Sequence, residues 1–130
     1  MIVQLRCAPL PFIGAIALHY WFVVIEAGEA HRWEVWQTAN AGGRSFGHVH
    51  CDLKAPDAGV GGGPSRIARE WQGEQARALH AVLQDAPRYP YCSRYLVWPG
   101  PNSNTFVAWV LEQAGVACRL GWRGIGKGYR

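Results

Sequence analysis

The sequence is poor in charged residues and lacks the cysteine spacing of common metal and redox sites. Asp, Glu, Lys and Arg make up 17% of the 130 residues, below the roughly 25% that is usual for soluble domains. Cys7, Cys51, Cys92 and Cys118 are scattered and form no C-x-x-C pair, so neither a zinc ribbon nor a thioredoxin-type site is indicated. We therefore expect no metal and no cofactor. Disulfide pairing and free thiols both stay open.

The chain also lacks an internal repeat and a long aliphatic run. Residues 7–25 are largely apolar, but Pro9 and Pro11 interrupt the stretch early and a His-Tyr-Trp cluster at 19–21 occupies its later half. A secretion signal or a membrane-spanning helix has plain aliphatic residues at such positions. The sequence therefore favours a soluble, cytoplasmic protein without a transmembrane segment.

The chain is rich in hydrophobic and aromatic residues. Hydrophobic residues make up 49% of the sequence, and seven Trp, five Tyr and four Phe far exceed what a disordered chain carries. The length predicts a single domain over residues 1–130. The net charge of +4 is too dispersed to indicate a nucleic-acid partner, and the oligomeric state stays open.

Four segments have the composition of strands. Ala15–Ile25 is dense in β-branched and aromatic residues, and the alternating stretch His31–Gln37 follows it after a turn. We expect these two to form an antiparallel hairpin. Arg44–Leu53 predicts a third strand, and Ile2–Leu5 predicts a short edge strand.

The second half of the chain has helical periodicity. Lys54–Pro64 is rich in Gly and Pro and predicts a loop that is mobile or wraps over the surface. Helical character is expected to begin near Ser65 and to continue through Glu74–Ala86, and a second helix is expected over Thr105–Ala114. The predicted fold class is α+β, with an antiparallel sheet packed against two or more helices.

Asn102-Ser103-Asn104 follows Pro101 and stands at the start of the second helix. The unpaired N–H groups and the dipole at a helix N-terminus stabilise negative charge, as an activated nucleophile or an oxyanion requires. The same residue types are also ordinary N-caps. Position alone therefore leaves a catalytic and a structural interpretation open.

The nonapeptide Trp98-Pro99-Gly100-Pro101-Asn102-Ser103-Asn104-Thr105-Phe106 resembles the signature of a bacterial family catalogued as domain of unknown function 3750. Shorter stretches resemble the same family: Gly14-Ala15 through His19 to Val24, Arg32-Trp33-Glu34-Val35, Tyr89-Pro90-Tyr91, Arg94-Tyr95, and Gly124-Ile125-Gly126-Lys127 with Tyr129. The resemblance covers the chain except for residues 39–73. Membership of this family by itself implies no particular chemical activity.

A second resemblance implies a site. In permuted papain-like proteins, such as the NlpC-type peptidases and lecithin–retinol acyltransferase, a His on an early strand precedes a nucleophile at a helix N-terminus. This chain is similar in that order, which implies a permuted papain-like domain with Ser103 as nucleophile and His19 as general base. Glu34 or His31 would orient His19. Backbone N–H groups near Ser103 and Asn104 would form the oxyanion hole, and Asn102, Asn104 and Thr105 would shape the site.

Ser103 stands where those enzymes carry Cys. A thiol beside an imidazolium ionises, whereas a Ser hydroxyl needs a concerted base and a well-formed oxyanion hole. The expected function is a hydrolase or acyltransferase that acts on an amide or ester, with a peptide, glycopeptide or acyl substrate. A degenerate site is equally open, and the alternative function is a non-catalytic module that binds a peptide or glycan strand.

Three other sets of residues rank lower. Cys92 is an alternative nucleophile if the Pro-rich arm folds back, although a packed or paired cysteine is the expected state. His48 and His50 share one side of a predicted strand while Cys51 points away, which favours an ordinary surface strand over a metal site. The tryptophans are expected to lie mostly in the core.

Overall fold

A computed structural model describes residues 1–130 and contains one six-stranded sheet with two α-helices and a 3₁₀ turn. The elements are β1 (Ile2–Pro9), β2 (Leu18–Glu26), β3 (Glu29–Val35), β4 (Arg44–Phe46), β5 (Val49–Cys51), β6 (Arg66–Gln72), α1 (Gly73–Gln84), η1 (Ala86–Arg88) and α2 (Ser103–Ala114). All paired strands are antiparallel, in the order β4-β5-β3-β2-β1-β6. The predicted α+β class is confirmed. Neither helix is long and apolar enough to cross a membrane.

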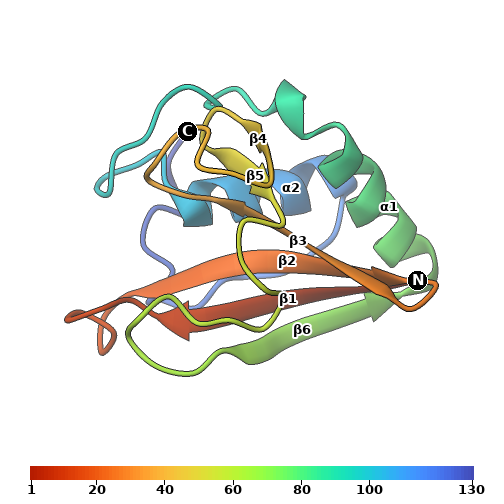
Figure 1. Ribbon diagram of the computed structural model, residues 1–130, viewed down its shortest axis with the longest axis horizontal. Helices are drawn as coiled ribbons and strands as arrows, with labels where there is room; N and C mark the ends of the chain where they lie inside the picture. Colours follow the sequence, from red (N-terminus) through yellow and green to blue (C-terminus); the bar gives the residue numbers. More distant parts are fainter.

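Both helices pack on the same face of the sheet, where the main core forms (Figure 1). Alternate residues of β2, such as Tyr20 and Phe22, join this core together with Leu79 of α1 and Phe106 of α2. The residues between them point to the opposite face, where Trp21 belongs to a smaller cluster. β2 is therefore buried on both faces, which explains why its sequence is apolar almost throughout.

The loop between β5 and β6 covers the face of the sheet opposite the helices. The Arg32 guanidinium donates from Nη1 to the carbonyls of Ala55 (2.8 Å) and Ala58 (2.7 Å), and Trp21 Nε1 donates to Pro56 O (2.9 Å). Of the two behaviours expected for this loop, wrapping over the surface is the one observed. A charged residue and an indole on the outer face of the sheet are thereby fully buried.

Two local expectations at the far edge of the sheet are wrong. The N-terminal strand is not an edge strand, because β1 runs to Pro9 and lies between β2 and β6. The helix expected from Ser65 is instead strand β6, whose backbone pairs with the otherwise free edge of β1. β6 is mostly exposed and buries only Trp71, so its hydrophobic pattern is weak and backbone pairing decides its conformation.

The single strand expected over Arg44–Leu53 is two short strands, β4 and β5, that pair as a hairpin. The turn between them is held by the later Pro-rich arm, because His48 N donates to Cys92 O at 2.6 Å. β5 pairs with β3 on its other side and all three of its residues are buried. The expectation of a surface strand here is therefore wrong.

α2 begins at Ser103 with a complete capping box. The side chain of Asn102 accepts hydrogen bonds from Asn104 N and Thr105 N, and Thr105 Oγ1 accepts from Asn102 N at 3.0 Å. The C-terminal segment closes over this cap, because Thr105 Oγ1 also donates to Gly126 O at 2.7 Å. The cap is consequently part of the protein interior.

Gly126→Ala tests whether the C-terminal segment must press this closely on the cap. Gly126 has φ +98°, and a Cβ on it would collide with the Asn102 side chain. We expect Gly126→Ala to lower the free energy of unfolding by about 2–4 kcal/mol, from backbone strain and loss of the cap. Chemical denaturation measures this change.

Gly128→Ala is the matched control, because a Cβ there meets nothing within 4 Å and such a change is expected to stay within about 0.5 kcal/mol. Equal stability of the two variants would contradict the observed packing of the C-terminal segment on the cap.

Candidate functional site

The site forms where β3 separates from β2. The hydrogen-bonded register of these strands ends at the Phe22–Trp33 pair, whereas β1 follows β2 on its other edge as far as Leu18. Residues 18–21 of β2 therefore have one edge without a strand partner. Buried N–H and C=O groups on such an edge require another partner.

Asn104 of α2 supplies that partner. Its Oδ1 accepts from Tyr20 N (3.1 Å) and its Nδ2 donates to Leu18 O (2.8 Å). The two bonds bracket His19, which lies between these residues on β2. The first turn of α2, including Ser103, is thereby fastened to the strand on both sides of His19.

Ser103 and His19 line one pocket of about 420 Å³. Their exposed fractions are 8% and 1%, so both lie at its buried end. His19 Nδ1 and Ser103 Oγ make no hydrogen bond within the protein, which leaves both atoms for each other or for a ligand. Two residues 84 positions apart in the sequence therefore meet at one cavity.

A buried chain of charged groups orients His19. His19 Nε2 lies 2.8 Å from Glu34 Oε1, and Arg32 Nη2 donates to the same oxygen at 2.9 Å. Arg32 Nε lies 2.8 Å from Glu34 Oε2, although its N–H is not aimed at that oxygen. The His19 ring also stacks on Trp21 and meets Trp36 edge-on, with centroids 5.4 Å apart in each case. The imidazole is thus held on several sides.

Glu34 stays ionised in this chain. Burial opposes the carboxylate, but the hydrogen bond and charge of His19 together with Arg32 outweigh it and hold the Glu34 pKa below its ordinary 4.5. An ionised carboxylate bonded to Nε2 stabilises a positive imidazolium. It also fixes the tautomer of a neutral His19, with the proton on Nε2 and the lone pair on Nδ1.

His31, the other candidate for orienting His19, lies further along β3 toward the hairpin turn. Its Nδ1 lies 2.6 Å from Asp52 and its Nε2 lies 3.4 Å from Glu29, and the side chain is half exposed. The bond to Asp52 raises the His31 pKa. Of the two alternatives that the sequence left open, the structure places Glu34 beside His19.

The first turn of α2 offers one free backbone donor. Asn102 Oδ1 already accepts from Asn104 N (3.0 Å) and Thr105 N (3.3 Å), whereas Ser103 N makes no hydrogen bond within the protein. The expectation that Asn104 N–H serves an oxyanion is therefore wrong, because the cap occupies that donor. Asn102 and Thr105 shape the turn, and their own side-chain donors are bonded within the protein and do not face a ligand.

Two residues of this region were missed by reasoning from the sequence. Gln37 lines the pocket, is exposed and makes no hydrogen bond within the protein, and nothing in its local pattern distinguishes it from strand sequence. Arg32 lies two positions before Glu34 on one strand, and residues at that spacing share a face. That spacing was the available signal for the ion pair.

The thiol of Cys92 lies outside this pocket. It donates to the carbonyl of Tyr89 at 3.2 Å, and burial raises its pKa, which makes it a poor nucleophile. All four cysteines are free thiols.

The histidines of the third predicted strand do not converge on a metal site. His48 Nδ1 lies 2.9 Å from Trp36 O, whereas His50 is buried and its Nε2 accepts from Ala41 N. Possible ligand atoms gather instead at His31, Cys51 and Asp52, within 4.8 Å of one another. The Arg44 guanidinium contacts the Cys51 sulfur at 3.5 Å, and a cation at this position disfavours a metal.

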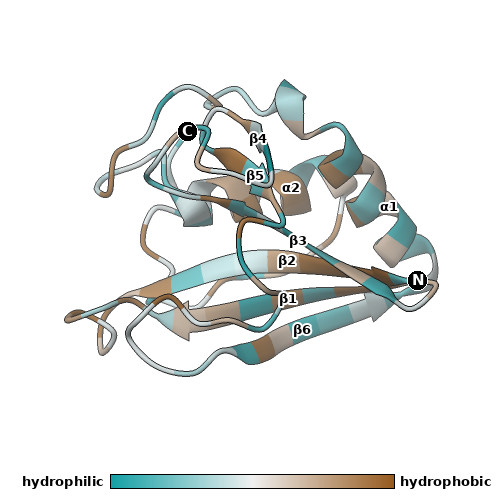
Figure 2. Cartoon of the chain, viewed as in Figure 1, coloured by the Kyte–Doolittle hydropathy of each residue, from teal (hydrophilic) through white to brown (hydrophobic).

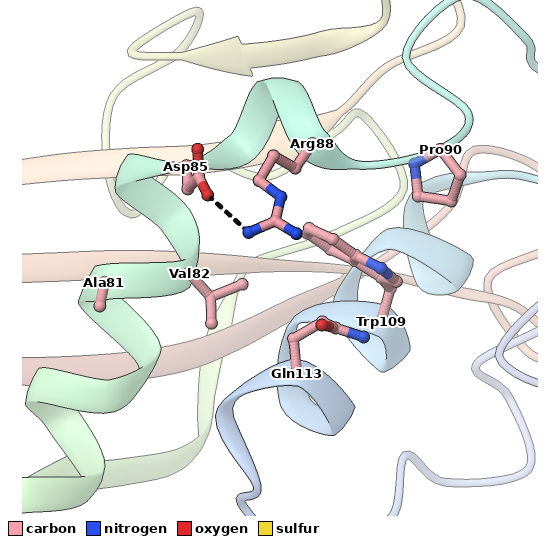
Figure 3. Close-up of a pocket in the computed structure, with 7 residues that line it drawn as sticks. All are labelled: Ala81, Val82, Asp85, Arg88, Pro90, Trp109 and Gln113. Carbon is pink, nitrogen blue, oxygen red and sulfur yellow. Dashed lines mark hydrogen bonds and ion pairs between the residues drawn. The ribbon is translucent and has the colours of Figure 1, made fainter.

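A second hollow, of about 490 Å³, opens between α1, η1 and α2 (Figure 3). Its lining combines Trp109 and Gln113 of α2 with Val82 of α1 and an exposed Arg88–Asp85 ion pair. It holds no His, Ser or Cys side chain, and its one carboxylate, Asp85, is exposed and paired with Arg88.

A family model described as "Protein of unknown function (DUF3750)" matches residues 1–129. The chain belongs to the DUF3750 family. The resemblance carried by the nonapeptide at 98–106 is thereby confirmed, and this DUF3750 chain places that nonapeptide at the pocket. No curated protein and no solved structure matches the chain.

The buried carboxylate of this DUF3750 chain predicts a dependence of stability on pH. Because the Glu34 pKa is lowered by folding, its contribution is complete above the ordinary pKa of 4.5 and is lost as the pH falls through the folded value. Glu34→Gln is expected to cost about 3–5 kcal/mol at pH 7, since Arg32 loses its counter-charge. The difference from wild type should shrink steadily below pH 4.5.

Urea denaturation at pH 3–7 measures this difference. Glu70→Gln is the control, because Glu70 is exposed on β6 and bonds only Gln4; we expect it to stay within about 0.5 kcal/mol of wild type. A difference between wild type and Glu34→Gln that stays constant down to pH 3 would show that Glu34 is not the ionised partner of His19 and Arg32.

Proposed function

We propose that this protein is a hydrolase or acyltransferase that acts on an amide or ester through Ser103, His19 and Glu34. The observation that carries the proposal is the buried 2.8 Å His19–Glu34 pair at the end of a pocket that also contains Ser103. A nucleophile, a base and a group that orients the base are the three parts required for covalent acyl transfer.

In the first half of the proposed reaction, Ser103 Oγ attacks the substrate carbonyl carbon while its proton moves to His19 Nδ1. The Nε2 proton of His19 stays on the bond to Glu34, so the imidazolium is paired with a carboxylate. Charge on the carbonyl oxygen develops near the N-terminus of α2, where Ser103 N–H is free.

In the second half, His19 returns the proton to the leaving amine or alcohol as the tetrahedral adduct collapses to an acyl-serine. Water or an acceptor alcohol or amine then attacks the acyl carbon and gives its proton to His19. His19 then returns this proton to Ser103 Oγ as the ester bond of the acyl-serine breaks. The cycle uses no group beyond substrate, acceptor and these side chains.

The arrangement also supports a distant likeness to permuted papain-like enzymes. A strand His precedes a helix-borne nucleophile in the chain, and a carboxylate holds the far nitrogen of that His. Arg32 extends the chain of charges and, after His19, helps to hold the Glu34 pKa below its ordinary value. The replacement of a thiol by a hydroxyl makes the base indispensable, because serine does not ionise by itself.

A fluorophosphonate tests the proposal directly on the wild-type protein. We expect one covalent adduct at Ser103, detected by intact mass and peptide mapping. His19→Ala should slow its formation at least about 100-fold, because proton removal from Oγ is lost. His80→Ala is the matched control: His80 lies on α1 and bonds Gln84, outside this pocket, and should leave the rate unchanged.

Ser103→Cys tests the electrostatics of the site independently of serine reactivity. The new thiol beside His19 at a helix N-terminus should have a lowered pKa and react with iodoacetamide at pH 6 at least about tenfold faster than in Ser103→Cys/His19→Ala. Cys92 and Cys118 are replaced by Ser beforehand, while Cys7 and Cys51 are buried.

An inert Ser103 together with a slow thiol in Ser103→Cys would overturn the catalytic proposal. The pocket would then serve a non-catalytic module for a peptide or glycan strand, with Asn102 and its neighbours as a structural cap.

A further inference from the structure

The pocket that contains Ser103 has an apolar wall, and no Asp, Glu, Lys or Arg side chain lines it. Ten of its 16 lining residues are hydrophobic. Among its polar side chains, Asn102 and Asn104 are already bonded to the cap, to Val97 O and to β2. Beside His19 and Ser103, only neutral groups such as those of Gln37 and Tyr95 are left for a ligand. The wall thus offers little to bind an ionic or polyhydroxylated ligand.

Two segments that contribute to this pocket carry most of the large exposed hydrophobic side chains of the protein. Six of its nine large exposed hydrophobic side chains fall in two short segments. They are Phe12, Ile13 and Ile16 between β1 and β2, and Leu96, Val97 and Trp98 before α2. Ile13, Val97 and Trp98 line the pocket itself. Both segments lie at the same end of the molecule, at the left of Figure 1, and contain hydrophobic residues in Figure 2.

Isolated exposed hydrophobic residues are ordinary, but a cluster of this kind marks a binding surface. Trp98 is 75% exposed, although the tryptophans were expected to lie mostly in the core. Trp98 and Ile13 line the same pocket as Ser103. An extended apolar group that entered the pocket would cover these side chains.

We propose that the acyl part of the substrate is an uncharged aliphatic chain, which lies between the residue 10–17 segment and the residue 95–98 segment. This inference rests on the proposed function, because it places the acyl carbonyl at Ser103 and His19. The chain then runs outward over Ile13, Val97 and Trp98. A peptide with ionised side chains would lose hydration at this wall without finding a counter-charge.

Binding is measured separately from catalysis by calorimetry on Ser103→Ala. The probes are the N-methyl amides of acetic, hexanoic and decanoic acid and of succinic acid, whose second carboxylate is ionised. We expect the Kd to fall by up to about fourfold for each methylene that is buried. The succinyl amide should bind no better than the acetyl amide.

Turnover is measured on the wild-type protein with p-nitrophenyl esters of the same four acids. The values of kcat/KM should rise from acetate to decanoate, and succinate should be the poorest substrate relative to its length. Ser103→Ala gives the background rate to be subtracted.

Trp98→Ala, made in the Ser103→Ala protein, tests the apolar wall of the pocket. Loss of this exposed side chain leaves the core intact. Affinity for the decanoyl amide should fall about tenfold, while affinity for the acetyl amide stays unchanged, because only the longer chain reaches the rim. Trp122→Ala is the matched control. Trp122 is 70% exposed and lines a different hollow, so both affinities should match those of Ser103→Ala.

The two proposals fail in different ways. Chain-length-dependent binding without Ser103-dependent turnover would support the acyl-chain site and overturn the catalytic proposal. Ser103-dependent turnover that prefers acetate or succinate would support catalysis and overturn the acyl-chain proposal. Equal binding of all four amides, or no effect of Trp98→Ala on the decanoyl amide, would also overturn the acyl-chain proposal.

Discussion

The contacts of the Glu34 carboxylate with Arg32 and His19 are the interactions on which the rest of the structure depends. The carboxylate is fully buried and receives contacts from Arg32 on one side and His19 on the other. Removing Glu34 would leave Arg32 as an uncompensated buried charge, and removing Arg32 would strip Glu34 of its cationic partner. Because Arg32 also holds the carbonyls of Ala55 and Ala58, one carboxylate couples the covering loop, two strands and the ring orientation of His19.

Asn104 also couples separate segments of the chain, but it does so through the neutral groups of its amide. Its amide bonds Tyr20 N, Leu18 O and Ile125 O, and so joins α2, β2 and the C-terminal segment at one point. A buried amide with its hydrogen bonds satisfied rigidifies its surroundings, whereas an unsatisfied one is costly. The position of Ser103 relative to His19 is therefore set by hydrogen bonds that belong to the fold, and a catalytic site could use that rigidity.

The two ends of the pocket have different physical character. At the buried end, His19 lines the pocket and is paired with the fully buried Glu34, and the open end is apolar and exposed. Exposed hydrophobic side chains are unfavourable in water, so their concentration at one mouth points to a ligand that covers them. The ion pair that we expect to stabilise this DUF3750 chain lies beside the first end, and the selectivity that we propose resides at the second.

Local sequence could predict β2, β3, α1 and α2 because each carries its own signal of composition, periodicity or capping. The nonapeptide at 98–106 likewise indicated a helix start with polar residues. The Arg44–Leu53 strand was predicted, but its division into β4 and the buried β5 was not, and β6 was predicted as helix, since these features depend on strand partners distant in sequence. The choice of Glu34 over His31 depended on how far β3 follows β2 before it diverges.

The sequence by itself determined the α+β class, the family, and the presence of His19, Glu34 and Ser103 on a strand, a second strand and a helix start. Only the tertiary structure decided that His19 and Ser103 share a pocket, that the buried Glu34 pairs with His19, and that the cap occupies the backbone donor of Asn104. It also decided that Trp98 lies at the mouth of that pocket. The physical reason is that hydrophobic periodicity encodes which face of an element is buried, whereas the partner of each buried polar group is set by long-range pairing of the backbone.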